Sequence, residues 1–344
     1  MQRLMPDSGS LETERRVQPV FRFGSIFSGL ALLVLILGFD RWLGTLPNRA
    51  DGPPRIVPVD YRPAALDPRG FLPLRLVGAW EVSVGDPRFG GISGLAADEG
   101  ELLALTDSGT LAWLPKPGSG GTARVRDLPA GPGLTTFKHG RDSEALAPDG
   151  RGGWWIAFEH HHQVWHYERG LQPVGAIELP AAGGAANLGV EAMLPTGGGL
   201  LLLGEGGETL LAAGAGPGVR ELSLRNPLGS LSDAALLPDG RRLLLVRNPT
   251  LLGFDNRLAE LVAAGRGYAV RPLGRLRLGA LANAEALAAE RIAAGTIRLW
   301  VMTDNAFSRR RATLLVALDL PELRPAPARA PSSKSRASAS APSR

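Results

Sequence analysis

Polar residues, most of them acidic, recur at two places in a repeated pattern along this sequence, and carboxylates repeated in this way could form a metal-binding or catalytic site. The first set opens short apolar runs and comprises Ser93, Glu144, Glu191, Asp233 and Glu285. The second set closes the next apolar runs and comprises Asp107, Glu159, Glu205, Arg247 with Asn248, and Asp304 with Asn305. Carboxylate oxygens gathered from several positions suit Ca²⁺ best, and Mg²⁺ or Mn²⁺ less well. The alternative for any single acid is that it caps a strand end or binds turn amides.

The segment from Asp142 to Glu159 is the best-preserved copy of the repeated unit. It begins with acids, continues through an apolar run, turns at Pro148-Asp149-Gly150 and returns through a second apolar run to Glu159. In an antiparallel hairpin the start of one strand and the end of the next lie at the same edge. Glu144 and Glu159 are therefore predicted to lie near each other at one edge of a sheet.

The spacing of the repeats predicts the architecture. Five units are visible, and their first positions lie 51, 47, 42 and 52 residues apart. Repeats of about 40–50 residues that contain several strands are typical of β-propeller blades. A sixth blade can be built from residues 74–82 and 313–318, and pairing of these first and last strands would close the ring. We predict an all-β fold, a β-propeller of six blades, with five or seven as alternatives.

A radial arrangement of such hairpins brings the repeated polar positions together at one end of a central channel. So many carboxylates repel one another unless cations or arginines neutralise them, which favours a functional face over a set of isolated strand caps. The predicted face comprises Ser93, Asp107, Asp142, Glu144, Glu159, Asn187, Glu191, Glu205, Asp233, Asn283, Glu285, Asp304 and Asn305.

Composition agrees with an all-β domain and excludes several classes of site. The chain has 344 residues, of which 44% are hydrophobic and 21% charged, with 45 glycines and 28 prolines for tight turns. The absence of cysteine excludes disulfides and Cys-based zinc or iron–sulfur sites. The basic tail, residues 324–344, carries a charge of +5, which equals the net charge of the whole chain, so the remainder of the chain is near neutral. A nucleic-acid partner is not supported, and we expect a monomer.

The N-terminal region contains an uncharged apolar run, residues 25–39, that predicts a membrane anchor. Arginines before the run place the N-terminus in the cytoplasm and the main domain outside it, in the periplasm if the cell has an outer membrane. A cleaved signal peptide and a buried core helix are the alternatives, but no A-x-A-like cleavage site follows the run. The predicted organisation is a cytoplasmic segment (residues 1–22), a membrane helix (23–43), a Pro-rich linker (44–73), a propeller (74–322) and a disordered basic tail (323–344).

Several short motifs, in order and spacing, resemble the phytase-like family, also described as "esterase-like activity of phytase". Together they cover roughly residues 74–320, and one departure is Arg247-Asn248, where an acid would be expected. The matching motifs are Gly91-Ile92-Ser93-Gly94-Leu95, Asp142-Ser143-Glu144-Ala145-Leu146, Phe158-Glu159, Asn187-Leu188-Gly189-Val190-Glu191, Asn283-Ala284-Glu285-Ala286-Leu287 and Thr303-Asp304-Asn305-Ala306-Phe307.

The resemblance implies an exported β-propeller that hydrolyses a phosphate ester or other ester with Ca²⁺. The expected catalytic residues are Glu144, Glu159, Glu191 and Glu285, and the expected metal ligands are Asp107, Asp142, Glu205 and Asp304. Substrate phosphate would be held by Lys138, His139, Arg141, Asn187 and Asn305. The rival interpretation is a non-catalytic propeller that binds an unknown ligand or a protein partner on the same acidic face. Arg309, Arg310 and Arg311 are expected to be solvated loop charges.

Other chemistries are poorly supported. The sequence contains neither a G-x-S-x-G elbow nor an H-E-x-x-H motif, and its glycines lie in predicted turns rather than in a phosphate-binding loop. The histidines at 160–162 and 166 could bind a transition metal, but a solvated or packing role fits their position at a strand exit better. Trp154, Trp155 and Trp165 are expected to pack between blades.

Overall fold

The computed structural model describes residues 48, 52–180, 189–214, 218–293, 295–308 and 311–321. The chain divides into two compact units, Met1–Leu46 and Pro47–Arg344, and all described residues belong to the second. The predicted membrane helix, the predicted tail and Asn187 lie outside the described residues. No helix in the described ranges is long and apolar enough to cross a membrane.

The second unit is all-β, and most of its strands form repeated antiparallel groups of four. Blade 1 comprises β3 (Ile92–Asp98), β4 (Glu101–Thr106), β5 (Thr110–Pro115) and β6 (Thr122–Asp127). Blade 2 comprises β7 (Ser143–Pro148), β8 (Trp154–Phe158), β9 (Gln163–Tyr167) and β10 (Pro173–Glu178). Blade 3 comprises β11 (Val190–Thr196), β12 (Gly199–Gly204), β13 (Leu210–Gly214) and β14 (Val219–Glu221).

Of the remaining two blades, blade 4 is built from consecutive strands and blade 5 combines strands from both ends of the described chain. Blade 4 comprises β16 (Leu231–Leu236), β17 (Arg242–Thr250), β18 (Gly253–Ala264) and β19 (Gly267–Leu276), with the short β15 (Leu224–Arg225) added in parallel at its edge. Blade 5 comprises β20 (Asn283–Ala293), β21 (Thr296–Asp304), β22 (Thr313–Pro321) and β2 (Arg75–Val84). Two short 3-10 helices, η1 (Pro68–Phe71) and η2 (Lys138–Gly140), lie in connecting loops.

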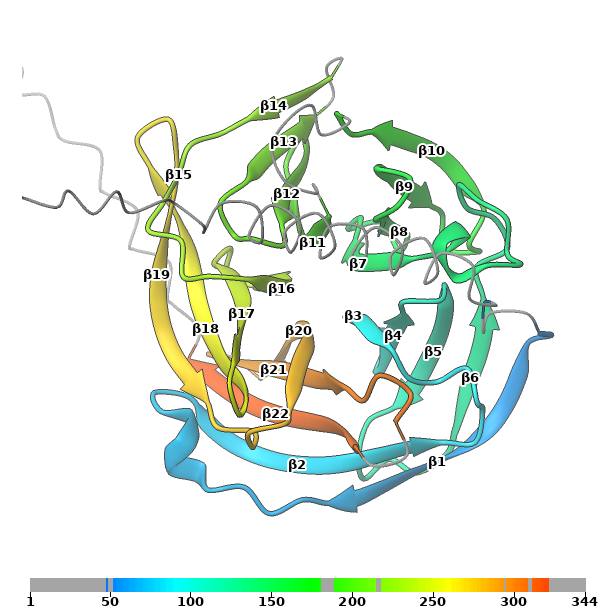
Figure 1. The fold of residues 1–344 in the computed structure, drawn as a ribbon. Helices are drawn as coiled ribbons and strands as arrows, with labels where there is room; N and C mark the ends of the chain where they lie inside the picture. Colours follow the sequence, from blue (N-terminus) through cyan, green and yellow to red (C-terminus); the bar gives the residue numbers. More distant parts are fainter. Residues whose placement is uncertain are drawn as a thin grey trace, which may run out of the picture. The chain divides into compact units, whose positions relative to one another are not determined.

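The described strands form five blades, not the predicted six. The inner strands β3, β7, β11, β16 and β20 each contact the next, and β20 contacts β3, which closes a ring around the central axis (Figure 1). The two strands assigned to a sixth blade, β2 and β22, pair with each other as predicted. However, β22 also pairs with β21, so both strands complete blade 5 and no sixth inner strand is left for them to join among the described residues.

The predicted Pro-rich linker contains a strand that joins two blades. In β1 (Arg55–Pro63), the first residues pair with β6 of blade 1 and the last residues pair with β2 of blade 5. The sheet therefore runs continuously from β20 to β3, and residues 55–63 belong to the domain. Prolines do not prevent this pairing, because a proline is tolerated in a strand where its missing N–H would not have donated to the neighbouring strand.

The core lies between the blades. In β12, Leu200 and Leu202 pack in a cluster with residues of blade 2, whereas Leu201 and Leu203 pack in a cluster with residues of blade 4. Each middle strand is thus buried on both faces, which explains its unbroken apolar sequence. Trp154 and Trp165 pack in the cluster between blades 1 and 2, as predicted. Burial of these faces holds the inner strand ends in place around the axis.

Candidate active site: a ring of strand ends

Each inner strand carries one pairing irregularity close to its start, and this irregularity selects the residue that faces the axis. The shifts fall between 92 and 94, 143 and 145, 190 and 192, 231 and 233, and 284 and 286. A bulge leaves its extra residue unpaired and re-aims its side chain. The five residues at the bulges are Ser93, Glu144, Glu191, Ser232 and Glu285.

In four of the five blades, a second residue is placed by a recurring backbone contact at the end of the second strand. The amide of Asp107 donates to the carbonyl of Gly91 at 2.7 Å, and the amide of Glu159 donates to that of Asp142 at 3.0 Å. Glu205 and Arg247 repeat the contact with Gly189 and Ser230, at 3.1 and 2.8 Å. In blade 5, Asp304 is the pairing partner of Asn283.

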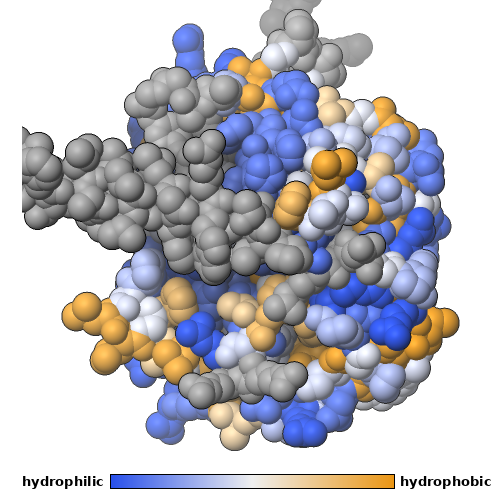
Figure 2. Space-filling view, turned by 45° about the vertical axis from the view of Figure 1, so that its right-hand side comes forward, coloured by the Kyte–Doolittle hydropathy of each residue, from blue (hydrophilic) through white to orange (hydrophobic). Residues whose placement is uncertain are grey.

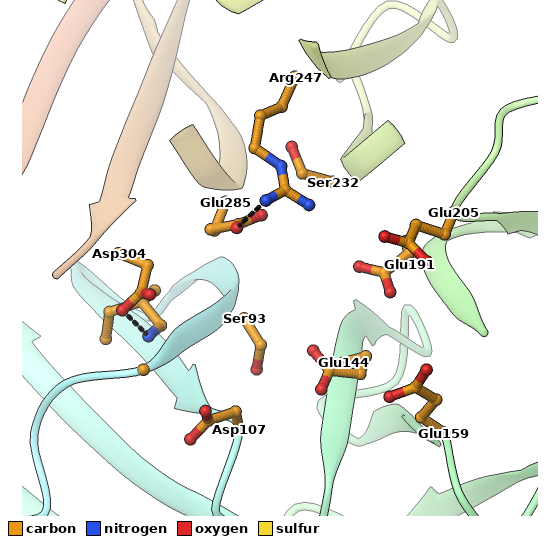
Figure 3. A pocket seen from close by; sticks show the side chains of 12 residues that line it. Ser93, Asp107, Glu144, Glu159, Glu191, Glu205, Ser232, Arg247, Glu285 and Asp304 are labelled. Carbon is orange, nitrogen blue, oxygen red and sulfur yellow. Dashed lines mark hydrogen bonds and ion pairs between the residues drawn. The ribbon is translucent and has the colours of Figure 1, made fainter. Parts of the chain in front are cut away.

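These ten positions meet in one cavity of about 200 Å³. Figure 3 shows four glutamates of blades 2 and 3 on one side of it and Arg247 with Glu285 on another. Seven carboxylates, two serine hydroxyls and one guanidinium line the cavity, together with Gly91 and Ile92. The lining side chains from the ten positions are Ser93, Asp107, Glu144, Glu159, Glu191, Glu205, Ser232, Arg247, Glu285 and Asp304.

The predicted equivalence of Asp233 to the inner acids was wrong by one residue. Ser232 lies at the bulge and lines the cavity, whereas Asp233 is fully buried and is absent from the lining. The Asp233 carboxylate accepts hydrogen bonds from the amides of Ala234 at 2.7 Å and Leu287 at 2.6 Å. Burial raises the pKa of Asp233 well above its usual value, despite these bonds. Asp233 therefore joins blade 4 to blade 5.

Burial and crowding strongly raise the pKa of two glutamates of the cavity, Glu144 and Glu191. Burial raises the pKa of Glu144 well above its usual value, and the charges of Asp142 and Glu191 raise it further. Burial also raises the pKa of Glu191, reinforced by Glu285, Glu205 and Glu159. Such shifts mean that the folded protein disfavours the simultaneous ionisation of all these groups. A bound cation would relieve the same repulsion.

Glu285 lies beside the one guanidinium of the cavity lining. Arg247 Nη1 is 2.9 Å from Glu285 Oε1, and Asn283 contacts both side chains. Burial raises the pKa of Glu285 to about 8, although Arg247 opposes the rise. The Nε of Arg247 is buried and makes no hydrogen bond to the described residues, so this side chain retains donor capacity.

Asp107 of blade 1 and Asp304 of blade 5 are held by different neighbouring groups. Burial raises the pKa of Asp107 to about 6, although Lys138, whose Nζ lies 3.3 Å from Oδ2, opposes the rise. Burial also raises the pKa of Asp304, whose Oδ1 accepts from the amides of Ile92 and Ala306 at 3.1 and 2.8 Å. Gly91 permits this packing, since it adopts a φ of +58° and a Cβ there would lie 2.4 Å from Asp107 Oδ1.

Asp142 stands behind the ring rather than in the cavity lining. Lys138 Nζ lies 2.5 Å from its Oδ1 and His160 Nε2 lies 3.0 Å from its Oδ2. Burial favours the neutral acid, yet these hydrogen bonds hold the pKa of Asp142 below its usual value. Burial would lower the pKa of Lys138, but Asp107 and Asp142 raise it overall. Lys138 is therefore a fixed positive charge between two aspartates.

The remaining predicted substrate contacts do not reach the cavity lining. Arg141 is buried and donates to the carbonyls of Gly133 and Gly140, which holds the preceding loop. His139 stacks on His160 with ring centroids 5.1 Å apart. Asn305 Oδ1 accepts from the amide of Phe307 at 2.9 Å, a local turn contact. Asn187, Arg309 and Arg310 lie outside the described residues.

The sequence contained a signal for one residue that the repeat comparison overlooked. Leu231-Ser232-Asp233 repeats the apolar–serine order of Ile92-Ser93-Gly94, so Ser232 and Ser93 are the equivalent pair. For His160 we predict a solvated or packing role; in the structure it also contacts Asp142, because the β7–β8 hairpin brings residues 142 and 160 close together.

The donor set fits a divalent cation. All seven acidic side chains supply the hard oxygen ligands that Ca²⁺ prefers, and the hydroxyl of Ser93 is buried without a hydrogen-bond partner among the described residues. Behind the ring, Asp142, Glu159 and His160 place one ligand atom each within 4.8 Å of one another, a mixed set that also suits Mn²⁺ or Zn²⁺. Glu159 belongs to both groups.

Solved structures similar to this chain include several proteins of unrelated name. A glutaminyl cyclase from Myxococcus xanthus is 16% identical, with a TM-score of 0.45, over 67% of this chain and 91% of that chain. A streptogramin B lyase is 9% identical, with a TM-score of 0.39, over 79% and 89%. A virginiamycin B lyase from Staphylococcus aureus is 10% identical, with a TM-score of 0.38, over 67% and 95%. At this level of similarity they do not indicate what this chain binds or catalyses.

Sequence comparison is more specific. No curated protein matches the chain. A family model described as "Phytase-like: Esterase-like activity of phytase" matches residues 87–307, which is more than half of the chain. The match begins before the first inner strand and ends just after Asp304, so it includes all ten positions of the ring. The chain belongs to the phytase-like family.

Proposed function

We propose that this protein is a membrane-anchored, extracytoplasmic hydrolase that cleaves a phosphate ester with the help of a divalent cation, Ca²⁺ in the first instance. The observation that carries the proposal is the convergence of two side chains from each of five blades into one acidic cavity. Its volume of about 200 Å³ corresponds to several water molecules, each occupying roughly 30 Å³ in the liquid, and suits an ion with a phosphoryl group.

The cation would lie among the glutamates of blades 2 and 3, held by Glu159 and Glu205 beside Glu144 and Glu191. These four lie together on one side of the cavity (Figure 3), and burial raises the pKa of Glu144, Glu159 and Glu191. A bound divalent cation would polarise a phosphoryl oxygen and acidify a water molecule. Without that positive charge, a phosphate dianion would be repelled by the seven acids.

Arg247 would bind the phosphoryl group. It is the single guanidinium in the cavity lining, and its side chain is fixed by Glu285 and Asn283. Charge-assisted hydrogen bonds from arginine to phosphate are strong and directional. This role replaces those expected for Arg141, His139 and Asn305, whose described contacts lie elsewhere. Lys138 would serve by neutralising Asp107 and Asp142 rather than by touching substrate.

Hydrolysis needs one group to accept a proton from the attacking water and another to donate a proton to the leaving alcohol oxygen. Glu144 would donate a proton to the leaving alcohol oxygen, because its raised pKa favours the protonated form. Glu191 also lines the cavity and, ionised beside the bound cation, would accept the proton of the attacking water. These roles leave Asp107 and Asp304 as further oxygen ligands.

The rival function is a non-catalytic propeller whose acids hold a structural ion while the same face binds a ligand or protein. Two measurements separate the functions: metal content of the purified protein, and turnover of a panel of phosphomonoesters with and without chelator. Glu144→Gln should reduce turnover by about 10²–10⁴-fold if Glu144 transfers a proton. The matched control is Glu221→Gln, an exposed acid on β14. Bound calcium without turnover in the parent protein would refute the enzymatic function.

A further inference from the structure

The hairpin between β17 and β18 protrudes beyond its blade at the cavity end. The pairing of β17 with β16 ends at Val246, whereas its pairing with β18 continues through four more pairs to Thr250 and Gly253. The neighbouring strand β19 reaches only Asn256 of β18. The tip therefore extends past the strands on both sides, and Arg247 of the cavity lies at its base.

The tip carries side chains that do not suit a turn facing water. Leu251 is 104% exposed and Leu252 is 81% exposed. Two-residue hairpin turns are usually built from Asn, Asp or Gly, because these residues adopt the turn conformation readily and are well hydrated. Two fully exposed leucines at a projecting tip instead indicate an apolar environment for this tip.

Further apolar side chains lie in loops at the same end. The inner strands start at the residues that line the cavity, so the loops that lead into these strands lie at the same end. Leu281, 61% exposed, lies in the loop that leads into β20, and the backbone of Ala280 in this loop bonds to Phe254 of the hairpin. Leu134, 76% exposed, lies in the loop that leads into β7. Hydrophobic side chains also protrude at the edge of the face shown in Figure 2, beside hydrophilic ones.

The chain enters the domain at this end as well. The amide of Asn48 donates to the carbonyl of Thr136 at 3.0 Å, in the same loop as Leu134. In the sequence, the uncharged apolar run of residues 25–39 ends nine residues before Asn48. Nine residues span at most roughly 30 Å when fully extended, so a membrane anchor in that run would keep this end of the domain near the bilayer.

We infer that the cavity end of the propeller docks on the lipid bilayer, with Leu251 and Leu252 inserted at the interface and Leu134 and Leu281 resting against it. Apolar side chains buried at the headgroup boundary, combined with a second anchor, give stable membrane attachment. The cavity then faces the membrane interface, and its ligand arrives from that side. The inference rests on the membrane-anchored location that is part of the proposed function, but not on its chemistry.

The absence of cysteine allows a direct test with the full chain in lipid nanodiscs. Single cysteines are introduced as Leu251→Cys, Ser119→Cys and Ile36→Cys, and each is labelled with an environment-sensitive fluorophore. Ser119 is exposed in the turn between β5 and β6, at the opposite end of the propeller. Nitroxide-labelled lipid should quench the label at 251 at least about twice as strongly as the label at 119.

The label at 36 separates failure of the anchor from failure of the orientation. Quenching at 36 and 251, but not at 119, supports the inference. Quenching at 36, with equal and weak quenching at 251 and 119, overturns the inference and leaves the anchor intact. In that case, cross-linking between copies through the unlabelled cysteine at position 251 would identify a second copy as the occupant. Absence of quenching at 36 overturns both. As a second variant, Leu252→Asp in the 251-labelled chain should reduce the quenching at 251.

Discussion

Arg247 Nη1 lies 2.9 Å from Oε1 of Glu285, and this pair connects the second strand of blade 4 to the inner strand of blade 5. Every other blade places a carboxylate at the position of Arg247. Because burial raises the pKa of Glu285 to about 8, the pair changes its net charge near neutral pH. Arg247 is therefore the one positively charged side chain among the ten positions of the ring, and it is the place where we propose that an anion binds.

Replacement of Arg247 should separate phosphate binding from cation binding. We expect Arg247→Gln to lower kcat/KM for a phosphomonoester by about 10²–10³-fold, because a donor to the transferring group is lost. Arg247→Lys should restore only part of the activity, since an ammonium lacks the planar fork of donors. Calcium affinity should not fall, because removal of a positive charge favours a cation.

The matched control for this prediction is Arg225→Gln, an exposed arginine on β15, measured by the same kinetic assay and by calorimetry with calcium. Unchanged kcat/KM in Arg247→Gln, with normal folding, would exclude Arg247 as the phosphate ligand.

Cation binding should depend on pH with a defined sign. Asp107 and Glu285 have pKa values of about 6 and about 8, so both carry protons in part of the range below pH 8. A bound cation favours the ionised form of nearby acids and so releases these protons, and its affinity should therefore rise as the pH increases from about 6 to 9. Calorimetry in two buffers of different ionisation enthalpy would measure the protons released. A calcium affinity that stays constant across this range would contradict the prediction.

Stability without cations should fall as the pH rises. Glu285 has an ordinary pKa of 4.5 and a pKa of about 8 in the folded protein, so the folded form binds more protons than the unfolded form between these values. Stability is then lost progressively from pH 4.5 to about 8 and is constant above. In chelator, the Tm should fall across this window by at least about 4 °C, which corresponds to 1–2 kcal/mol for a domain of this size.

Two variants make the stability prediction specific. Glu285→Gln should reduce the dependence of the Tm on pH, because its amide cannot ionise, and Glu221→Gln should leave the dependence unchanged. Saturating calcium should restore the Tm at pH 8 in the parent protein. A Tm that rises from pH 5 to pH 8 in chelator would show that these acids are not destabilised by burial.

Replacement of Asp233 should lower the stability of the fold and leave calcium binding unchanged. Asp233→Ala removes the acceptor for two buried amides, of Ala234 and Leu287, and should destabilise the fold by about 1–3 kcal/mol. Calcium affinity of the folded fraction should be unchanged, because Asp233 does not line the cavity. Denaturant unfolding and calcium calorimetry check the two parts separately. Loss of calcium binding without loss of stability would place Asp233 among the ligands after all.

Several features of this protein were determined by its sequence alone. The apolar runs, the Gly-rich turns and the recurrence of acids at 42–52 residue intervals predicted a propeller with an acidic face, and they located Glu144, Glu159, Glu191, Glu205 and Glu285 at one end of it. These properties are local, since a strand alternates its side chains with a period of two and a hairpin brings its strand ends together wherever it lies.

The tertiary structure decided the rest. The blade number depended on the pairing of β22 with β21 as well as with β2, which places both β2 and β22 in blade 5. The choice between Ser232 and Asp233 depended on a bulge, and a shift of one residue sends a side chain to the opposite face of a strand. The contacts of Arg141 with Gly133 and of Asp142 with His160 depended on the paths of short loops, which residue type and spacing do not specify. Residue type and spacing thus set which groups reach the cavity end, and non-local pairing sets which of them face the axis.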